Sequence, residues 1–305
     1  RHFVNDLRGN RIIVANRLAE QYYNSSIFPT DAEGYPVGFG KNSQAVLLPS
    51  FLAAYTGAIS DKIGESAKGI SLSAFRDFPI PNWTAKYNGL MRYEFFKENF
   101  KRFSVQHSYR ASYTINSFRS NLDYNINPNG FDKGGNFLTK TIIANVNLVE
   151  QFSPLVKIDM EMKSSVKLTA EIKKDRSLSL SFDNNLLTEI QGDEYVFGLG
   201  YRIKDLRIRS KLAGPRNIIK SDLNMKADIS IRNNKTIIRY LDLDNNQVSA
   251  GQTIWSMRYS ADYAFSKNLT AILYFDYAFS EYAISTAFPQ TTIRSGFTLR
   301  YNFGN

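Results

Sequence analysis

The chain of 305 residues contains no cysteine and only two histidines, His2 and His107. This composition excludes disulfides, thiolate chemistry and metal sites built from several histidines, and it argues against a Ser-His-carboxylate triad. The net charge of +10 would suit a nucleic-acid-binding protein. However, lysine and arginine are spread along the predicted strands and share faces with aspartate and glutamate, so we expect no nucleic-acid partner, no enzyme, no cofactor and no metal ion.

Residues 1–80 differ from the rest of the chain. Apolar residues at helical spacing between Ile12 and Tyr22 predict one short helix, and residues 46–55 predict another, with Gly, Asn, Ser and Pro filling the remainder. A connection of this length is uncommon unless it has a role. We therefore expect this segment to cap or line another part of the protein.

Most of the chain from residue 81 onward predicts antiparallel strands, because apolar and polar side chains alternate with a period of two. The first predicted strand covers residues 83–89. Residues 90–102 combine Phe with Lys and Arg and predict either a short amphipathic helix on the periplasmic surface or an ordinary loop.

Two long strands with internal irregularities come next. Alternation over residues 103–113 changes register near Asn116 and Ser117 and resumes at residues 122–126, which predicts a bulge within one strand. Parity is unbroken across Pro154, which predicts a second long strand over residues 142–162 with a bulge or local edge there.

Eight further strands bring the predicted count to about eleven: residues 166–182, 195–203, 206–212, 223–231, 237–243, 255–265, 269–279 and 291–303. Short turns are predicted near Ser164, Asp205, Asn233 and Lys267. Long polar links are predicted at residues 184–193, 213–221, 244–252 and 280–290. Short turns on one side and long loops on the other are typical of an outer-membrane β-barrel, in which the short turns are periplasmic.

The last strand alternates without interruption. Ile293, Phe297, Leu299, Tyr301 and Phe303 share one parity, and small or polar residues mostly hold the other. An aromatic-ended strand almost at the end of the chain resembles the closing strand of a bacterial outer-membrane barrel, which carries the signal recognised by the barrel-assembly machinery. We predict that these five residues form that signal.

In a membrane barrel one parity faces lipid and the other faces the lumen. The parity predicted to face lipid contains Trp255, Tyr259, Tyr263, Leu273, Phe275, Phe297 and Leu299. The residues predicted to face the lumen are Arg258, Asp262, Asp276, Arg294 and Arg300. This assignment follows because a charged side chain on the lipid face costs about 2–4 kcal/mol at the bilayer midplane.

The predicted strand count is odd, whereas a single-chain bacterial barrel with both termini in the periplasm needs an even number. Counting back from a periplasmic end places residues 1–80 on the extracellular side. The chain also begins at Arg1, without an initiator Met or a signal peptide. We therefore expect an all-β fold: the C-terminal portion of a very large transmembrane antiparallel β-barrel with an N-terminal mixed helix and loop extracellular segment, cut within an outer loop and completed by strands from elsewhere.

Five stretches resemble the C-terminal end of the SprA/Sov family. They are residues 48–57 (LPSFLAAYTG), 79–83 (PIPNW), 117–124 (SFRSNLDY), 150–155 (EQFSPL) and 194–201 (EYVFGLGY). The resemblance runs over nearly the whole chain. Members of this family are the giant outer-membrane translocons of the type IX secretion system in Bacteroidota.

The resemblance implies a protein-conducting channel in the bacterial outer membrane that exports folded cargo proteins carrying a C-terminal signal, a process linked to gliding motility. It also implies the following partners: outer-membrane lipid, the rest of the same barrel polypeptide, secreted cargo, a shuttle barrel protein, a periplasmic plug protein and a surface peptidyl-prolyl isomerase. It assigns none of their contacts to individual residues of this chain.

Other interpretations of the same residues stay open. A small-solute porin or a receptor-type outer-membrane barrel would show the same alternation. A soluble β-sandwich also has strands with one apolar face, although residues 142–162 and 166–182 exceed the usual strand length. Residues 242–246 resemble part of a calcium loop but lack its Gly and its distal Glu. A barrel phospholipase or protease would need a histidine beside a nucleophile.

Overall fold

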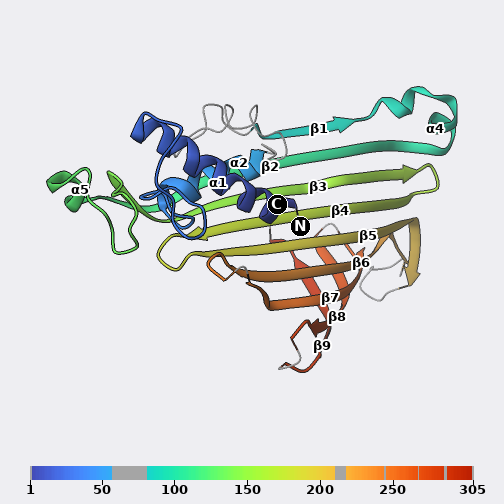
Figure 1. Cartoon of the computed structure of the whole chain (residues 1–305). Coiled ribbons are helices and arrows are strands. Elements are labelled where there is room, and N and C mark those ends of the chain that lie inside the picture. The colour runs from blue at the N-terminus through green and yellow to red at the C-terminus, as the bar shows by residue number, and fades with distance from the viewer. Residues whose placement is uncertain are drawn as a thin grey trace.

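Nine antiparallel strands form one sheet in this computed structural model, which describes residues 2–56, 81–209, 218–243, 245–266, 268–284 and 287–303. Each strand lies beside its neighbour in the chain, so the order across the sheet is β1 to β9 (Figure 1). The strands are β1 (Trp83–Tyr87), β2 (Phe100–Ser120), β3 (Thr141–Met162), β4 (Val166–Ser181), β5 (Leu186–Arg209), β6 (Ile218–Tyr240), β7 (Asn245–Ala264), β8 (Leu269–Tyr282) and β9 (Gln290–Tyr301).

The links between strands alternate between two ends of the sheet. The β1–β2 link contains the 3-10 helix η1 (Gly89–Arg92) and the short helix α4 (Glu94–Asn99), and we call this the α4 end. The β2–β3 link contains the short helix α5 (Leu122–Ile126), and we call this the α5 end. The two ends lie on opposite sides of the molecule (Figure 1).

The described residues contain nine strands and not about eleven, because two predicted turns lie inside strands. At Asp205, predicted as a turn, the register of β5 against β6 shifts between Ile203 and Leu206, and Asp205 has a φ of 55°. This is a bulge, whose twisted backbone suits the same residues as a turn. Asn233 and Asn234, also predicted as a turn, lie opposite Asp193 and Gly192 in an unbroken stretch of β6.

The predicted long links are shorter than expected for a related reason. Residues 186–193 belong to β5 and residues 245–252 belong to β7, so the β4–β5 and β6–β7 links at the α5 end are only residues 182–185 and 241–244, and the predicted contrast between short turns at one end and long loops at the other is wrong for these two links. Residues 186–193 and 245–252 are mostly polar because β5 and β7 continue beyond the apolar part of the sheet, and this polarity suggested links. The end of the predicted 206–212 strand and most of the predicted 213–221 link lie outside the described residues.

Both predicted irregularities in β2 and β3 are confirmed. The register shifts between Ile115 and Phe118 in β2, and between Phe152 and Val156 in β3, around Pro154. The prediction that the β2 strand resumes at residues 122–126 is wrong, because these residues form α5. The side chain of Asn121 caps this helix by accepting a hydrogen bond from the backbone N–H of Asp123.

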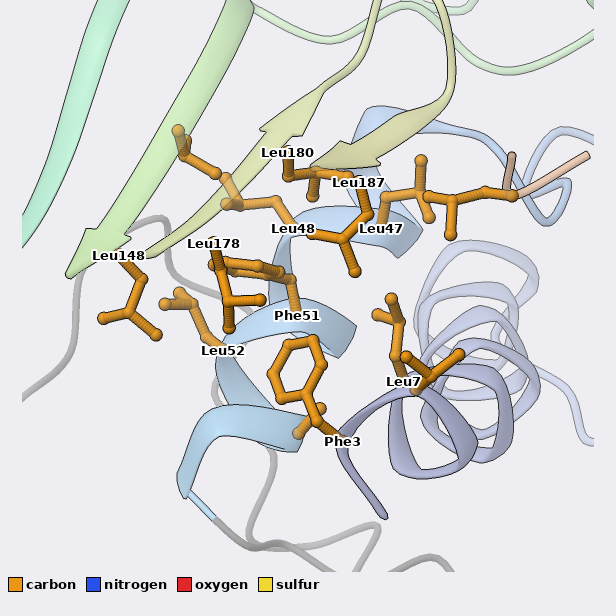
Figure 2. Close-up of a cluster of buried hydrophobic side chains, with 14 of the residues drawn as sticks. Phe3, Leu7, Leu47, Leu48, Phe51, Leu52, Leu148, Leu178, Leu180 and Leu187 are labelled. Atoms are coloured by element: carbon orange, nitrogen blue, oxygen red, sulfur yellow. The ribbon is translucent and has the colours of Figure 1, made fainter. Parts of the chain in front are cut away.

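Helices α1 (His2–Tyr23) and α2 (Gln44–Thr56) cover β3, β4 and β5 at the α5 end. The α2 helix confirms the helix predicted at residues 46–55, whereas α1 is longer than the predicted helix near Ile12. Leu7 and Phe51 are fully buried against the sheet leucines Leu148, Leu178, Leu180 and Leu187 (Figure 2). Burial of each such side chain contributes roughly 1.5–3 kcal/mol, so this core fixes the helices to the sheet.

A second cluster ties the loop between α1 and α2 to the β2–β3 link. The Phe39 and Phe137 ring centroids lie 5.2 Å apart, and the backbone N–H of Gly40 donates to Oδ1 of Asn136 at 3.0 Å. Residues 2–56 are thereby attached to the sheet at the α5 end. None of the described helices has the length and apolar character that crossing a membrane requires.

Candidate functional site

One face of the sheet carries an aligned block of apolar side chains on its last five strands. The block spans residues 195–203 of β5, 223–231 of β6, 255–263 of β7, 271–279 of β8 and 291–299 of β9. At one edge Tyr195 lies opposite Ile231, which lies opposite Trp255, which lies opposite Phe279. Within the block every second residue points to this face, and all of these are aliphatic or aromatic except Thr291 and Ser295.

The other edge of the block is also aligned from strand to strand. Ile203 lies opposite Leu223, Leu223 opposite Tyr263, and Tyr263 opposite Ala271, which in turn lies opposite Leu299. The stretch is therefore nine residues long on β5, β6 and β7, and Leu269 and Tyr301, which lie opposite each other, extend it to eleven residues on β8 and β9. A transmembrane β-strand requires about 9–11 residues. The apolar block thus has the height of a membrane crossing.

Many side chains of the apolar block are open to the surroundings. Phe197 is 51% exposed, Trp255 47% and Phe297 63%. No described element covers this part of the sheet, since helices α1 and α2 contact residues nearer the α5 end. In a β-sandwich a second sheet would bury such a face.

The same face becomes polar directly beyond the block, toward the α5 end. Asp193 lies opposite Asn233, and Asn233 lies opposite Thr253, each two residues from the edge of the block. Lys174 forms an ion pair with Asp193 at 3.3 Å. A sharp change from apolar to charged side chains at one level of several neighbouring strands is what a membrane boundary would require.

The opposite face, which we call the polar face, carries charges that alternate in sign from strand to strand. Asp228 of β6 lies opposite Arg258 of β7, which lies opposite Asp276 of β8, which lies opposite Arg294 of β9. Opposite charges at directly facing positions stabilise a sheet by roughly 0.2–1 kcal/mol per pair. This row therefore favours the observed register.

All five residues predicted to line a lumen lie on the polar face. Arg258, Asp276 and Arg294 belong to the alternating row, and Asp262 lies opposite Asn224, whose amide donates to Asp262 Oδ2 at 2.9 Å. Arg300 lies opposite Thr270 on the same side. The residues of the predicted lipid-facing parity, such as Tyr259 opposite Phe275, all lie on the face of the apolar block.

The polar face is hollowed over β4 to β7. A groove of about 880 Å³ is lined by side chains of both signs, among them Lys167, Glu171, Glu194, Asp228, Arg232 and Arg258. Within it Arg232 lies 3.6 Å from Glu194, and Lys173 lies 3.5 Å from Glu194. The groove surface is therefore mixed in charge, and its lining contains seven cationic and four anionic side chains.

Glycines let long side chains lie flat against the polar face. A Cβ on Gly198 would come within 2.7 Å of Oδ1 of Asp228, and a Cβ on Gly296 within 2.5 Å of the hydroxyl of Tyr274. Each glycine is the cross-strand neighbour of the side chain that covers it. The Asp228 and Tyr274 side chains therefore each lie over a glycine of the neighbouring strand.

A buried ionic cluster lies beyond the apolar block, where helix α1 covers the sheet. Nε of Arg176 lies 3.0 Å from Oε1 of Glu189, Nε of Arg239 lies 3.1 Å from Oε2, and the Gln191 amide donates to Oε1 at 2.7 Å. Burial raises the pKa of Glu189, but the hydrogen bonds from Arg239 and Gln191 and the charges of both arginines outweigh burial and hold this pKa below its usual value. The sequence prediction misses this cluster, because it assigns residues 184–193 to a link between strands. Leu187, Glu189 and Tyr195 share one parity, and this pattern indicates that the strand already begins before Glu189.

A second polar contact joins helix α2 to the sheet. The hydroxyls of Tyr55 and Tyr109 lie 2.8 Å apart, and the Tyr109 hydroxyl donates to Oε1 of Glu150 at 3.0 Å. Burial, together with the neighbouring hydroxyl and carboxylate, raises the pKa of Tyr55. Both contacts attach helices to the sheet.

The remaining candidate groups for chemistry are engaged in structure. His107 is half-buried, and its Nδ1–H donates to the carbonyl of Leu155 at 2.6 Å. Asp242, from the stretch that resembles a calcium loop, accepts hydrogen bonds from the side-chain amides of Asn42 and Asn185. Asp244 lies outside the described residues. The described part of the chain contains no group of three His, Asp or Glu side chains that could hold a metal ion.

The predicted closing strand is the edge strand β9. Ile293, Phe297, Leu299 and Tyr301 lie on the apolar face, and Phe303 follows the end of the strand with its ring centroid 4.7 Å from that of Tyr301. Among the described residues β9 is hydrogen-bonded only to β8, and β1 only to β2.

Comparison of the sequence with protein-family models and with curated proteins finds no match.

Proposed function

We propose that this chain forms part of the wall of a very large outer-membrane β-barrel, and that the barrel is a protein-conducting channel. The observation that carries the proposal is the apolar block, which is nine to eleven residues high on five neighbouring strands. Its height equals a membrane crossing, and most of its side chains are open to the surroundings, Tyr263 and Ala271 being the buried exceptions. The block would face lipid and the polar face would line the lumen.

The open edges of the sheet support a barrel larger than these strands. An unpaired strand edge is not tolerated in lipid, because its backbone groups would lack hydrogen-bond partners. The free edges of β1 and β9 would therefore pair with strands outside the described sheet. In a barrel completed in this way, β9 is the closing strand and its aromatic end is the assembly signal.

The polar face supports the conduction of proteins. A folded cargo protein presents a surface of mixed charge, and a lumen with one dominant sign would retain part of that surface. Arg258 and Asp276 at facing positions, and Arg232 near Glu194, place opposite charges side by side on this wall, so that its modest cationic excess is spread among pairs of both signs. Together with the resemblance to the SprA/Sov family, this favours export of folded cargo by the type IX secretion system, linked to gliding motility, with no catalytic step by this chain.

The test separates this function from that of a small-solute porin or receptor barrel. Deletion of the gene is expected to block surface delivery of folded secreted proteins and to leave uptake of small solutes unchanged. Both quantities can be measured in the same strain, by surface proteolysis of a secreted reporter and by uptake of a labelled sugar. Normal secretion with impaired uptake would replace our proposal by the porin alternative.

A further inference from the structure

Four phenylalanine rings gather at the α4 end of the sheet. Phe95 and Phe96 belong to α4, and Phe100 and Phe103 lie at the start of β2. The Phe96 ring centroid lies 4.9 Å from that of Phe103 and 5.8 Å from that of Phe100, and Phe95 lies 5.5 Å from Phe96. These four rings belong to neither buried core, and Phe95 is 66% exposed.

The phenylalanine cluster continues the apolar face of the sheet. Phe103 lies opposite Met160 and Phe100 opposite Met162, and Met160 in turn lies opposite Leu168 on the face of the apolar block. The α4 helix therefore extends the same apolar surface past the end of the strands. Such a surface, open to the surroundings, marks a site of interaction.

Basic side chains surround the phenylalanine cluster. Arg92 precedes α4, Lys97 lies within it, and Lys163 in the β3–β4 turn is adjacent because its backbone N–H donates to the carbonyl of Asn99 at 3.3 Å. Among the described residues, none of these three cations forms an ion pair, whereas Lys101 pairs with Glu161 at 3.3 Å. Glu94 and Glu98 on α4 reduce the positive charge without cancelling it, since residues 92–102 contain four basic and two acidic side chains.

We propose that the phenylalanine cluster and the flanking cations Arg92, Lys97 and Lys163 dock on the phospholipid surface at the α4 end, with the rings among the upper acyl chains and the cations at the headgroup phosphates. This rests on the proposed membrane location of the apolar block. Aromatic side chains beside lysine and arginine are the composition that binds in the interfacial plane. The apolar continuity with β2 and β3 sets the rings at the level where the bilayer would end, and the cations at the level of the phosphates.

The depth of α4 can be measured by spin labelling, because the chain has no native cysteine. The complete protein carrying Phe95→Cys is reconstituted in phosphatidylcholine with phosphatidylglycerol, labelled, and exposed to molecular oxygen or to a water-soluble nickel complex. We expect strong relaxation by oxygen and weak relaxation by nickel, as at a site in the acyl region. Strong relaxation by nickel would show that the ring lies in water, and weak relaxation by both would show a protein partner; either result overturns the proposal.

Two further variants separate this inference from the proposed function. A label at Tyr259→Cys reports the apolar block, so a lipid signal at Tyr259 without one at Phe95 would refute only the docking of α4. Phosphatidylglycerol is expected to place the label at Phe95→Cys deeper than phosphatidylcholine alone does, and replacing Lys97 and Lys163 together by Gln is expected to reduce this gain in depth, with Arg92 retaining part of it. Lys133→Gln in the β2–β3 link, at the opposite end of the sheet, serves as the control and should leave that gain intact. An equal gain in the double variant would show that the cations do not meet phosphate.

Discussion

The guanidinium carbon of Arg176 lies 5.0 Å from the centroid of the Phe3 ring, so one side chain of β4 contacts helix α1 while its Nε holds the buried carboxylate of Glu189. A cation over an aromatic ring contributes roughly 0.5–2 kcal/mol, more when it is shielded from water. The attachment of α1 to the sheet therefore combines the leucine core with an ionic contact. The two parts can be separated by mutation.

Replacement of Glu189 by Ala is expected to weaken the attachment of the helices by about 3–5 kcal/mol, because Arg176 and Arg239 would be left without their buried carboxylate. Limited proteolysis of residues 2–56 measures this change as a faster cleavage rate. Asp205→Asn serves as the control, since Asp205 and its partner Lys220 are both more than half exposed. We expect the control to change stability by less than about 1 kcal/mol, and equal effects in the two variants would contradict the structure.

The attachment of the helices should also depend on pH in one direction. The pKa of Glu189 is lower in the folded state than its ordinary value of 4.5, so its contribution is complete above that value and is lost as the pH falls through the folded-state pKa. The protection factors of α1 and α2 against hydrogen exchange, which are corrected for the intrinsic exchange rate at each pH, should fall on acidification below about pH 4.5, so that exchange accelerates relative to that intrinsic rate. In Glu189→Gln this acceleration should be reduced; an unchanged profile would assign the pH dependence to other groups.

The two faces of the sheet should differ in their access to water in the membrane. Single variants Arg258→Cys and Asp276→Cys are expected to react with a water-soluble thiol reagent, because these positions lie on the polar face. Tyr259→Cys and Phe275→Cys, their immediate neighbours on the apolar face, should be protected by lipid. Mass spectrometry of the labelled protein in intact outer membranes gives the result, and preferential labelling at Tyr259 and Phe275 would reverse the proposed orientation.

Truncation of the aromatic end of β9 should impair assembly more than stability. Tyr301→Ala with Phe303→Ala removes the two rings that contact each other at the end of the edge strand. We expect less assembled protein in the outer membrane, measured as the heat-modifiable, protease-resistant fraction. Phe288→Ala is the control, because Phe288 is about as exposed as Phe303 but lies in the β8–β9 link. A normal yield from the double variant would remove the assembly role from this strand.

The face of each residue could be predicted from the sequence because parity survives most irregularities. Trp255, Tyr259 and Phe275 were correctly grouped, and Arg258 and Asp276 were correctly placed on the other face. The length of the strands was harder to predict, since a strand that leaves its apolar environment loses its alternation while its backbone pairing continues. Asn233 and Asn234 have the composition of a turn, but their backbone is held by the neighbouring strand.

The position of the N-terminal helices could not be predicted from local patterns. Phe51 and Leu178 are both ordinary apolar residues in sequence, and their contact depends on packing between elements more than a hundred residues apart. The ionic cluster at Glu189 was missed for the same reason, because Arg176, Glu189 and Arg239 come from three strands. The sequence alone predicts that residues 1–80 cap or line another part of the protein. It does not predict which face of the sheet the helices in this segment cover.

Helices α1 and α2 pack on the same face as the apolar block, and the strands beneath them continue past the block; β5, for example, has 24 residues. At about 3.3 Å per residue such a strand is roughly 80 Å long, against about 30 Å for the hydrocarbon core of a bilayer. In the proposed barrel the sheet would therefore extend beyond the membrane at the α5 end. Helices α1 and α2 would pack on the outside of this extension and leave the lumen open. A cargo domain that has passed the level of the bilayer would still be enclosed by the barrel wall. It would reach the external medium only at the end of the strands, beyond the membrane surface.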